Sequence, residues 1–429
     1  MFAKSLKKAA ALAVLATAAG AGIAQADVTT SWSGAPRTNE EDRQFKVNGR
    51  FQYDIANVNA DFTNGADLNF TRSYSRRIFI GVEGRFTQQW RYNVKFDLKP
   101  GDGSGSTNGG EVGLDDAYLE YAGSNYSIFI GQNNAVSHLE DRDSSNNIPF
   151  NERSAFDQAF VNGGKTFGVD YLTNGGNWSL GAGIHGDSLN NSEATVDESV
   201  EGRLRGTWAP IYQRTPDGIT VLHLGLAARY RDSGGATSGF AAYSARPAVA
   251  SATGLGAPIS TIGTYRHDQL YVGEVAFQHN AFGVEAEYAM LNAQPDNGSQ
   301  PDRSFKGGYI DLFWSPTGES RNYSASDGSF GRVTPFRTLG SDGGIGHVML
   351  SARYDFLDLT DGTLGGAPSE YSAGKMKGWV AGVTWAPIAY VKFQANYSSY
   401  NIDRFTTGGA IAATDGDVDA ITFRTQIDW

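Results

Sequence analysis

The chain has 429 residues, with 35 basic and 46 acidic side chains and a net charge of −11. This acidic balance argues against a nucleic-acid partner, because nucleic-acid phosphates require a basic face. The absence of cysteine excludes disulfides, thiolate metal sites and thiol catalysis. Beyond the N-terminal segment there is no run of about 18 apolar residues, which excludes a helical membrane protein and leaves a closed β-barrel as the membrane structure that the composition permits.

The N-terminal segment has the pattern of a secretory signal peptide. Three lysines within the first eight residues precede a run rich in Ala, Leu and Val, which ends in the small-residue pattern AQA at 24–26. We therefore expect residues 1–26 to be removed, residues 27–44 to form a short periplasmic segment and residues 45–429 to form a transmembrane barrel. The mature chain would keep about 403 residues and a net charge of about −14.

Residues 90–98, WRYNVKFDL, alternate apolar and polar side chains without exception. This period of two predicts a strand with one apolar and one charged face. The same alternation, weaker in some stretches, predicts an all-β, antiparallel barrel of 16 strands at 45–55, 77–86, 90–98, 113–122, 125–132, 165–173, 177–186, 200–208, 221–231, 269–278, 282–290, 305–314, 347–356, 376–385, 390–398 and 421–429. Aromatic residues near the ends of the apolar faces fit interfacial girdles, namely Trp90, Trp178, Trp208, Tyr230, Trp314, Trp379, Trp385 and Trp429.

The joins between the predicted strands alternate in length, as expected for a barrel with long external loops and short periplasmic turns. A short join such as TQQ (87–89) follows one strand, and a very long one, 133–164, follows the fifth. One join breaks the rule, because 315–345 is long on the periplasmic side. A hidden hairpin within 56–72 or 232–268 would raise the count to 18 strands.

Several strings are more specific than the periodicity: SRRIFIGVEG (75–84), VGLDDAYLEY (112–121), NERSAFDQAF (151–160) followed by FGVDY (167–171), and SPTGESRNYSASDGSFGRVTPF (315–336) continuing into ARYDFLDLTDG (352–362). In these strings the chain resembles the phosphate-selective porin O and P family. The resemblance implies a homotrimer of 16-stranded porins in a Gram-negative outer membrane, each with the loop at 133–164 folded into the pore. It further implies contact with outer-membrane lipid and lipopolysaccharide, and assembly by the barrel-assembly machinery, which would read the aromatic end of the last strand.

The best-known members of that family move phosphate or polyphosphate along inward-facing arginines. If the apolar faces of the strands meet lipid, the basic residues that line the channel here are Arg203, Arg205, Arg229, Arg231, Arg77, Arg91 and Lys95. The arginine fork matches phosphate oxygens, and a row of arginines lets an anion pass between weak sites. The alternative is that the arginines are paired with Glu201 or with nearby aspartates.

The predicted constriction loop is acidic, and its charged candidates are Glu140, Asp141, Arg142, Asp143, Glu152 and Arg153. Many family members carry lysine in this region, whereas this chain reads GQNNAVSHLEDRD (131–143) and has no lysine before Lys165. Carboxylates at the narrowest point would oppose an anion filter. They favour the alternative function, a general and weakly cation-preferring porin without phosphate selectivity.

Two further patterns have little weight as functional sites. Asp141, Asp143, Ser145 and Glu152 have the spacing of a calcium loop, but Asn146 stands where the turn requires Gly, so we expect no metal and no cofactor.

The string Gly186-Asp187-Ser188-Leu189 matches a hydrolase signature, yet none of the six histidines has Asp three residues before it, so we interpret the string as part of an external loop. A hydrolase using Ser188 and a barrel without a conducting pore remain as alternatives. The preferred function is a water-filled diffusion channel for small anionic or polar solutes, with phosphate and polyphosphate as candidates.

Overall fold

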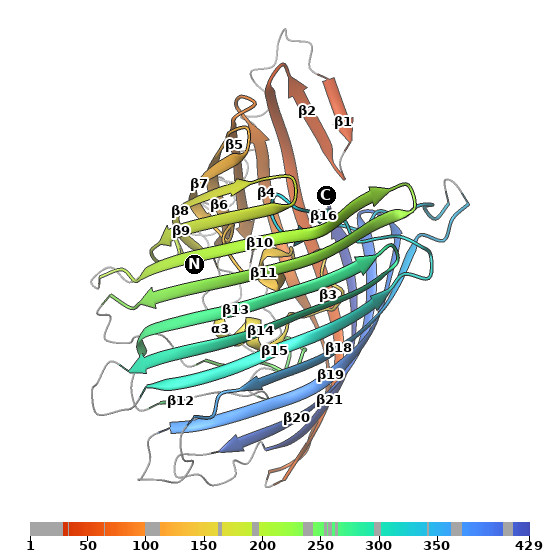
Figure 1. Cartoon of the computed structure of the whole chain (residues 1–429). Coiled ribbons are helices and arrows are strands. Elements are labelled where there is room, and N and C mark those ends of the chain that lie inside the picture. The colour runs from red at the N-terminus through yellow and green to blue at the C-terminus, as the bar shows by residue number, and fades with distance from the viewer. Residues whose placement is uncertain are drawn as a thin grey trace, which may run out of the picture.

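The computed structural model describes residues 29–32, 34–63, 65–98, 112–161, 165–190, 197–234, 243–252, 255, 260–261, 265–295, 302–340, 343–361, 371–405 and 415–429. Within these residues, 16 long antiparallel strands each pair with the next along the chain, and the last pairs with the first (Figure 1). They are β3 (Arg43–Phe62), β4 (Leu68–Arg85), β5 (Trp90–Asp97), β6 (Gly113–Ala122), β7 (Tyr126–Asn133), β8 (Thr166–Asn174), β9 (Trp178–His185), β10 (Val200–Thr215), β11 (Gly218–Asp232), β13 (Tyr265–His279), β14 (Phe282–Pro295), β15 (Arg303–Trp314), β18 (His347–Asp358), β19 (Tyr371–Ile388), β20 (Val391–Phe405) and β21 (Gly416–Asp428). The predicted 16-stranded barrel is confirmed.

Several strands are longer than the apolar alternation predicted. β3 continues to Phe62 and β4 begins at Leu68, so most of 56–72 belongs to these two strands. Polar residues face outward in this extension, so the alternation of apolar residues does not extend into it. One of them is Asn57, which donates to Thr71 Oγ1 at 2.9 Å. The described part of 232–268 outside β11 and β13 holds only the two-residue strand β12 (Ser260–Thr261). Neither segment supports an 18-stranded barrel.

The N-terminal part of the described chain extends the sheet. β1 (Thr29–Trp32) and β2 (Pro36–Glu40) form a hairpin, and β2 pairs with the start of β3. The predicted signal peptide at 1–26 lies outside the described residues, and the boundary of the periplasmic segment at 27–44 stays a prediction.

The outer face of the barrel carries the apolar half of each alternating strand. Trp90, Trp178, Trp208 and Trp314 are between 40% and 52% exposed, as residues that face lipid should be in an isolated barrel. In the described part of the chain, none of the helices has the length and hydropathy needed to span a bilayer.

The barrel closes where its last strand meets its first. Backbone hydrogen bonds of 3.1 Å run both ways between Gly49 and Trp429, and the indole of Trp429 lies over Gly49. A Cβ at Gly49 would overlap that ring, so only glycine fits there without a shift of the indole.

We expect Gly49→Ala to destabilise the closed barrel by about 1–3 kcal/mol, because the added methyl group overpacks this seam. Urea unfolding, followed by the heat-modifiable mobility of the folded barrel on gels, measures the effect. Gly202→Ala is the control, since a Cβ at Gly202 meets nothing within 4 Å. Equal stability of the two variants would contradict the role of Gly49.

Two long joins enter the lumen and fill part of it. The first, called here the constriction loop, is residues 134–165 between β7 and β8 and contains α2 (Leu139–Arg142) and α3 (Ala155–Phe160). The second, called the periplasmic insert, is residues 315–346 between β15 and β18 and contains β16 (Tyr323–Ser324) and β17 (Ser329–Phe330). In Figure 1, α3 lies inside the barrel behind β13 and β14.

The apolar core of the protein lies inside the barrel, along β13 to β21 and the adjoining parts of β3 and β4. Phe156 of α3 stacks on Tyr309 of β15 with ring centroids 6.1 Å apart, and Phe160 meets the buried Tyr243 edge-on. Burial of these rings stabilises the loop against this wall. The constriction loop therefore fills this side of the lumen.

Candidate channel constriction

Carboxylates on β14 and β18, the two neighbours of β15 in the barrel, hold the constriction loop inside the lumen. On β14, Glu287 accepts hydrogen bonds of 3.0 Å from the N–H groups of Leu139 and Glu140 at the start of α2. On β18, Asp355 Oδ2 accepts a hydrogen bond of 2.9 Å from the N–H of Ala155 at the start of α3. N–H groups in the first turn have no partner within the helix, so these carboxylates satisfy them.

Two predicted acidic residues of the loop are buried in ion pairs. Glu140 accepts from Arg353 of β18 at 2.6 Å, and Asp143 accepts from Arg321 of the periplasmic insert at 2.7 Å. Both carboxylate residues are 1% exposed. Arginines therefore pair with both carboxylates inside the protein, and the expectation that they oppose an anion filter at the narrowest point stays a prediction.

The remaining acidic candidates behave in the same way. Glu152 accepts from Arg76 at 2.7 Å and from Arg424 at 3.0 Å. Asp141 pairs with Arg153 at 3.2 Å, within the loop itself. Each of these carboxylates therefore helps to fix the shape of the loop.

The two basic candidates of the loop also make structural contacts. Arg153 donates to the carbonyl oxygens of Glu140, Asp141 and Asp143 at 3.0 to 3.1 Å, which closes the turn after α2. Arg142 pairs with Asp327 of the periplasmic insert at 3.3 Å. The loop and the insert are thus joined by charged side chains.

The protonation of the loop follows from these pairs. Burial alone would lower the pKa of His138, but Glu287 and Asp157, 3.1 and 3.3 Å away, raise it well above its ordinary value. Burial alone would raise the pKa of Asp141, yet Arg153 brings it down to about 2. For Glu152, the nearby arginines outweigh burial and lower its pKa well below the ordinary value. These three side chains are therefore charged at neutral pH, whereas burial outweighs Arg321 and raises the pKa of Asp143 to about 8.

The structure does not assemble the calcium loop that the spacing suggested. Asp141, Asp143 and Glu152 point to three different arginines, and Ser145 accepts from Arg50 at 2.7 Å. Among the described residues, no group of three His, Cys, Asp or Glu side chains could hold a metal ion.

The contacts of Ser188 are also not those of a hydrolase nucleophile. Ser188 Oγ donates to Gln132 Oε1 at 3.1 Å, whereas the nearest histidine in sequence, His185, is buried against Asp170 at 2.8 Å.

The four arginines of the predicted track face the lumen from β10 and β11, and all four are paired. Arg205 binds Glu274 of β13 with two hydrogen bonds of 2.8 and 2.9 Å, and Arg203 pairs with Glu201. Arg229 and Arg231 share Asp268, which lies 3.2 Å from Arg229. These contacts agree with the alternative given above, in which the arginines are paired with nearby carboxylates.

A β-bulge brings two neighbouring arginines into the lumen. The register of β3 and β4 shifts between Gln52 and Tyr53, which leaves Arg76 without a partner residue on β3. Arg76 then binds Glu152 of the loop, and the predicted Arg77 donates to Gln52 at 2.9 Å. A strict period of two places only Arg77 inside, so the sequence reasoning missed Arg76.

The periplasmic insert supplies a second arginine that the sequence reasoning missed. Arg321 lies between Asp143 and Glu285, 2.7 Å from each, and its guanidinium covers the ring of Phe330 at 4.5 Å. The unexpected length of this join was the one signal that it does more than connect two strands.

The larger cavities inside the barrel lie along β3 to β6, and a smaller one of about 40 Å³ is lined by Glu201, Arg203 and Arg229, among others. Two cavities of about 310 Å³ each share Glu83 and Asn93. Among the described residues, they are lined by three acidic side chains, Glu83, Glu120 and Asp428, and by seven basic ones, Arg37, Lys46, Arg50, Arg85, Arg91, Lys95 and Arg332. Arg91, a predicted channel residue, is the most open, with 51% of its side chain exposed beside Glu120 at 3.6 Å.

The predicted Lys95 meets a second lysine at this wall. Lys95 and Lys165 both contact the carboxylates of Asp115 and Asp116, and the distances to Asp115 are 3.1 and 3.2 Å. Lys165 ends the constriction loop, so the fold brings a lysine to the passage although the early part of the loop has none. With this group included, basic side chains still outnumber acidic ones.

A closed 16-stranded barrel with an apolar outer face, an inward-folded loop and a charged lumen defines an outer-membrane porin of Gram-negative bacteria. The chain belongs to the family described as phosphate-selective porin O and P, whose model matches residues 45–429. The resemblance noted in the sequence is thereby confirmed.

Two relatives match most of the chain. Porin O of Pseudomonas aeruginosa is 28% identical over 418 residues, which cover 91% of this chain and 89% of that protein. An uncharacterized protein of Caulobacter vibrioides is 29% identical over 410 residues, covering 92% of this chain and 75% of its own length.

Solved structures match the fold at low sequence identity. OmpT of Vibrio cholerae, described as a trimer form, gives a TM-score of 0.51 at 10% identity, covering 91% of this chain and all of that one. An anion-selective porin of Comamonas acidovorans gives 0.50 at 10% identity, covering 90% of this chain and all of that one.

Proposed function

We propose that this outer-membrane channel conducts small anions, phosphate among them, along the wall formed by β3 to β6. The observation that carries the proposal is the seven-to-three excess of basic over acidic side chains around the two open cavities. A cation-lined passage with low-dielectric walls raises the local concentration of anions. The family description and the anion-selective porin of Comamonas acidovorans support the same solute class.

The path proposed here differs from the arginine track on β10 and β11. Those arginines are held by Glu201, Glu274 and Asp268, so their charge is largely compensated. On the β5 wall, Arg91 is half-exposed and 3.6 Å from Glu120, so its charge reaches the passage. Exposed guanidinium groups bind an anion without first breaking a buried pair.

Reversal potentials in planar bilayers with chloride, phosphate and potassium test the proposal. We expect anions to permeate faster than potassium, and Arg91→Ala to lower the anion preference roughly two- to threefold, as loss of one partly screened charge should. Arg229→Ala is the matched control, because Arg229 lies outside both cavities and shares its carboxylate with Arg231. A wild-type channel that prefers cations would support the general porin instead. A larger effect of Arg229→Ala than of Arg91→Ala would indicate that anions pass along β10 and β11.

We also propose that the channel is a homotrimer whose interface includes the wall from β5 to β9. These five strands have 8 to 10 residues, whereas β10 to β21 of the barrel have 12 to 18. A tilted strand needs about 9–11 residues to cross the bilayer, so several strands of the short wall barely span it unaided. Contact with neighbouring copies would shield this wall from lipid.

Ile130→Arg tests the interface, because Ile130 faces outward on β7 and is 45% exposed. We expect the trimer to dissociate in mild detergent, with the mass measured by analytical ultracentrifugation, since the interface would have to bury a charge. Leu312→Arg on β15, a residue 46% exposed on the long wall, should leave the trimer intact. A trimer lost only in the Leu312 variant would place the interface elsewhere.

A further inference from the structure

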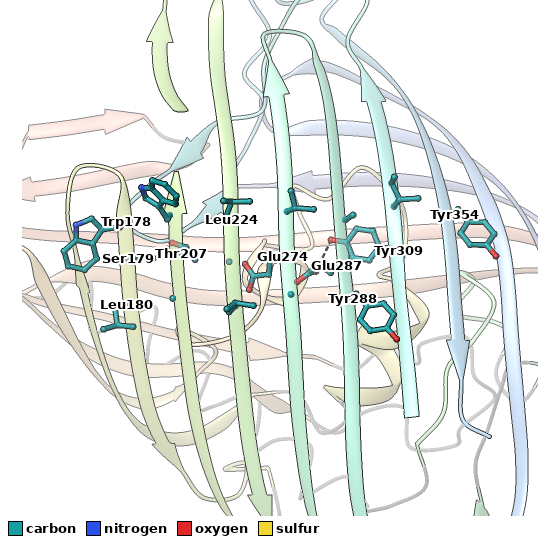
Figure 2. Close-up of a pocket in the computed structure, with 18 of the residues that line it drawn as sticks. Trp178, Ser179, Leu180, Thr207, Leu224, Glu274, Glu287, Tyr288, Tyr309 and Tyr354 are labelled. Carbon is teal, nitrogen blue, oxygen red and sulfur yellow. Dashed lines mark hydrogen bonds between the residues drawn. The ribbon is translucent and has the colours of Figure 1, made fainter. Parts of the chain in front are cut away.

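A shallow apolar groove of about 980 Å³ crosses the outer face of the barrel from β9 to β18 (Figure 2). Its floor includes the small residues Gly206, Gly273 and Ala286, and a Cβ at Gly273 would meet nothing within 4 Å. Its sides are large outward-facing side chains, of which Figure 2 labels Trp178, Leu180, Leu224, Tyr288 and Tyr354. The groove is therefore an open apolar hollow on the lipid-facing surface.

Strand pairing connects the groove to a basic group at its β18 end. Leu226, Gly273, Tyr288, Gly308 and Phe356 stand opposite one another in sequence across β11 to β18, and the next position on β19 is Lys377. Lys377 is exposed on the outer face. The row that lines the groove thus ends on a lysine.

A second exposed lysine lies beside the same end. Lys306 of β15 is two residues before Gly308, and it stands opposite Asp358, which pairs with Lys375 at 3.3 Å. Asp403 on β20 also stands opposite Lys375, so the acidic residues on this face gather around Lys375. Lys306 and Lys377 are exposed cations beside this end of the groove.

These lysines lie in the extracellular halves of their strands, Lys306 as the fourth of 12 residues of β15 and Lys377 as the seventh of 18 residues of β19. β15 begins at Arg303 and β19 begins at Tyr371, each after a join on the side opposite to the short periplasmic turns. The strands of this wall are long enough to face lipid, unlike the short wall of β5 to β9. The basic end of the groove therefore lies at the level of the outer-leaflet headgroups.

We propose that this surface binds one molecule of lipopolysaccharide through its phosphorylated lipid anchor, with an acyl chain in the groove and a phosphate on Lys306 and Lys377. Shape and charge support the same occupant. The glycine floor admits a methylene chain close to the backbone, and the two ammonium groups match a lipid phosphate at the interface. The proposal does not depend on the solute that the pore conducts.

Native mass spectrometry of the intact purified channel tests the site, with added lipid A, lipid A lacking phosphate, and phosphatidylglycerol. We expect one lipid A per chain. The double variant Lys306→Gln/Lys377→Gln should weaken its binding about thirtyfold, the effect of two interfacial lysines. Gly273→Ile should also weaken binding, by filling the groove. The control Gly202→Ile adds the same side chain at another open outward glycine, and Arg214→Gln removes an exposed cation near a periplasmic turn.

Three results would overturn the proposal. The first is lipid A binding that is unaffected by both the lysine and the glycine variants. The second is equal affinity for phosphatidylglycerol or for lipid A without phosphate, since either would remove the specificity for a phosphorylated glycolipid. The third is a loss of trimer in Gly273→Ile without a change in lipid binding, which would make the groove an interface between copies.

Discussion

Arg321→Ala should give a noisy channel with a raised mean conductance and a destabilised barrel interior. Arg321 is 2% exposed and is paired with Asp143 of the constriction loop and Glu285 of β14. Its removal leaves two carboxylates buried without their cation, which costs about 3–5 kcal/mol in comparable buried pairs. The loop should then leave its position for part of the time, because the link between the loop and the periplasmic insert is lost.

Single-channel recording and thermal unfolding of the same preparation measure the two effects of this change. Arg214→Ala is a suitable control, because Arg214 donates to the carbonyl of Tyr323 in the same insert at 2.9 Å but does so from the exposed side. A quiet channel of unchanged conductance and stability in Arg321→Ala would show that the insert does not hold the loop.

Glu152→Gln should increase the anion preference of the channel. Glu152 neutralises Arg76 with two hydrogen bonds of 2.7 and 2.8 Å and shares Arg424 with Asp54. The side chain of glutamine is neutral, so Arg76 loses its compensating charge, whereas Arg424 remains paired with Asp54. We expect the anion-to-cation permeability ratio to rise several-fold, since a charge in a narrow low-dielectric pore acts strongly on permeating ions.

The effect of Glu152→Gln depends on the ionisation of Glu152. The pKa of Glu152 is lowered well below its ordinary value, because the arginines outweigh the effect of burial. The pair therefore contributes stability above the unfolded pKa of glutamate, roughly pH 4.3, and that stability is lost as the pH falls through the lower folded value. Wild type and variant should therefore differ in selectivity from neutral pH down through the ordinary pKa of glutamate, because the folded carboxylate is still ionised there.

Reversal potentials measured from mildly acidic to neutral pH would check this prediction. Glu319→Gln is the control, because Glu319 is equally buried but accepts from the N–H of Phe336 and from Thr317. A selectivity in Glu152→Gln equal to that of wild type would mean that Arg76 is too far from the conducting path to matter.

The sequence by itself determined the barrel, the number of its strands and the side that most residues face. A period of two is a local property, since successive side chains of a strand point to opposite faces whatever their partners are. For this reason Arg91, Lys95 and Arg229 could be placed in the lumen from their neighbours alone. The prediction weakened where outward residues become polar, as at Asn57, and where a bulge breaks the period, as at Arg76.

Only the tertiary structure decided which lumen charges are available to a solute. Glu140 and Arg353 are 213 positions apart, and Asp143 and Arg321 are 178 apart, so no local pattern pairs them. The same holds for the arginines on β10 and β11, which a linear reading could not assign to Glu274 or Asp268. The pairing depends on how the constriction loop and the periplasmic insert fill one side of the lumen. That packing leaves the basic excess on the β3 to β6 wall, because the carboxylates able to neutralise it are already bound elsewhere.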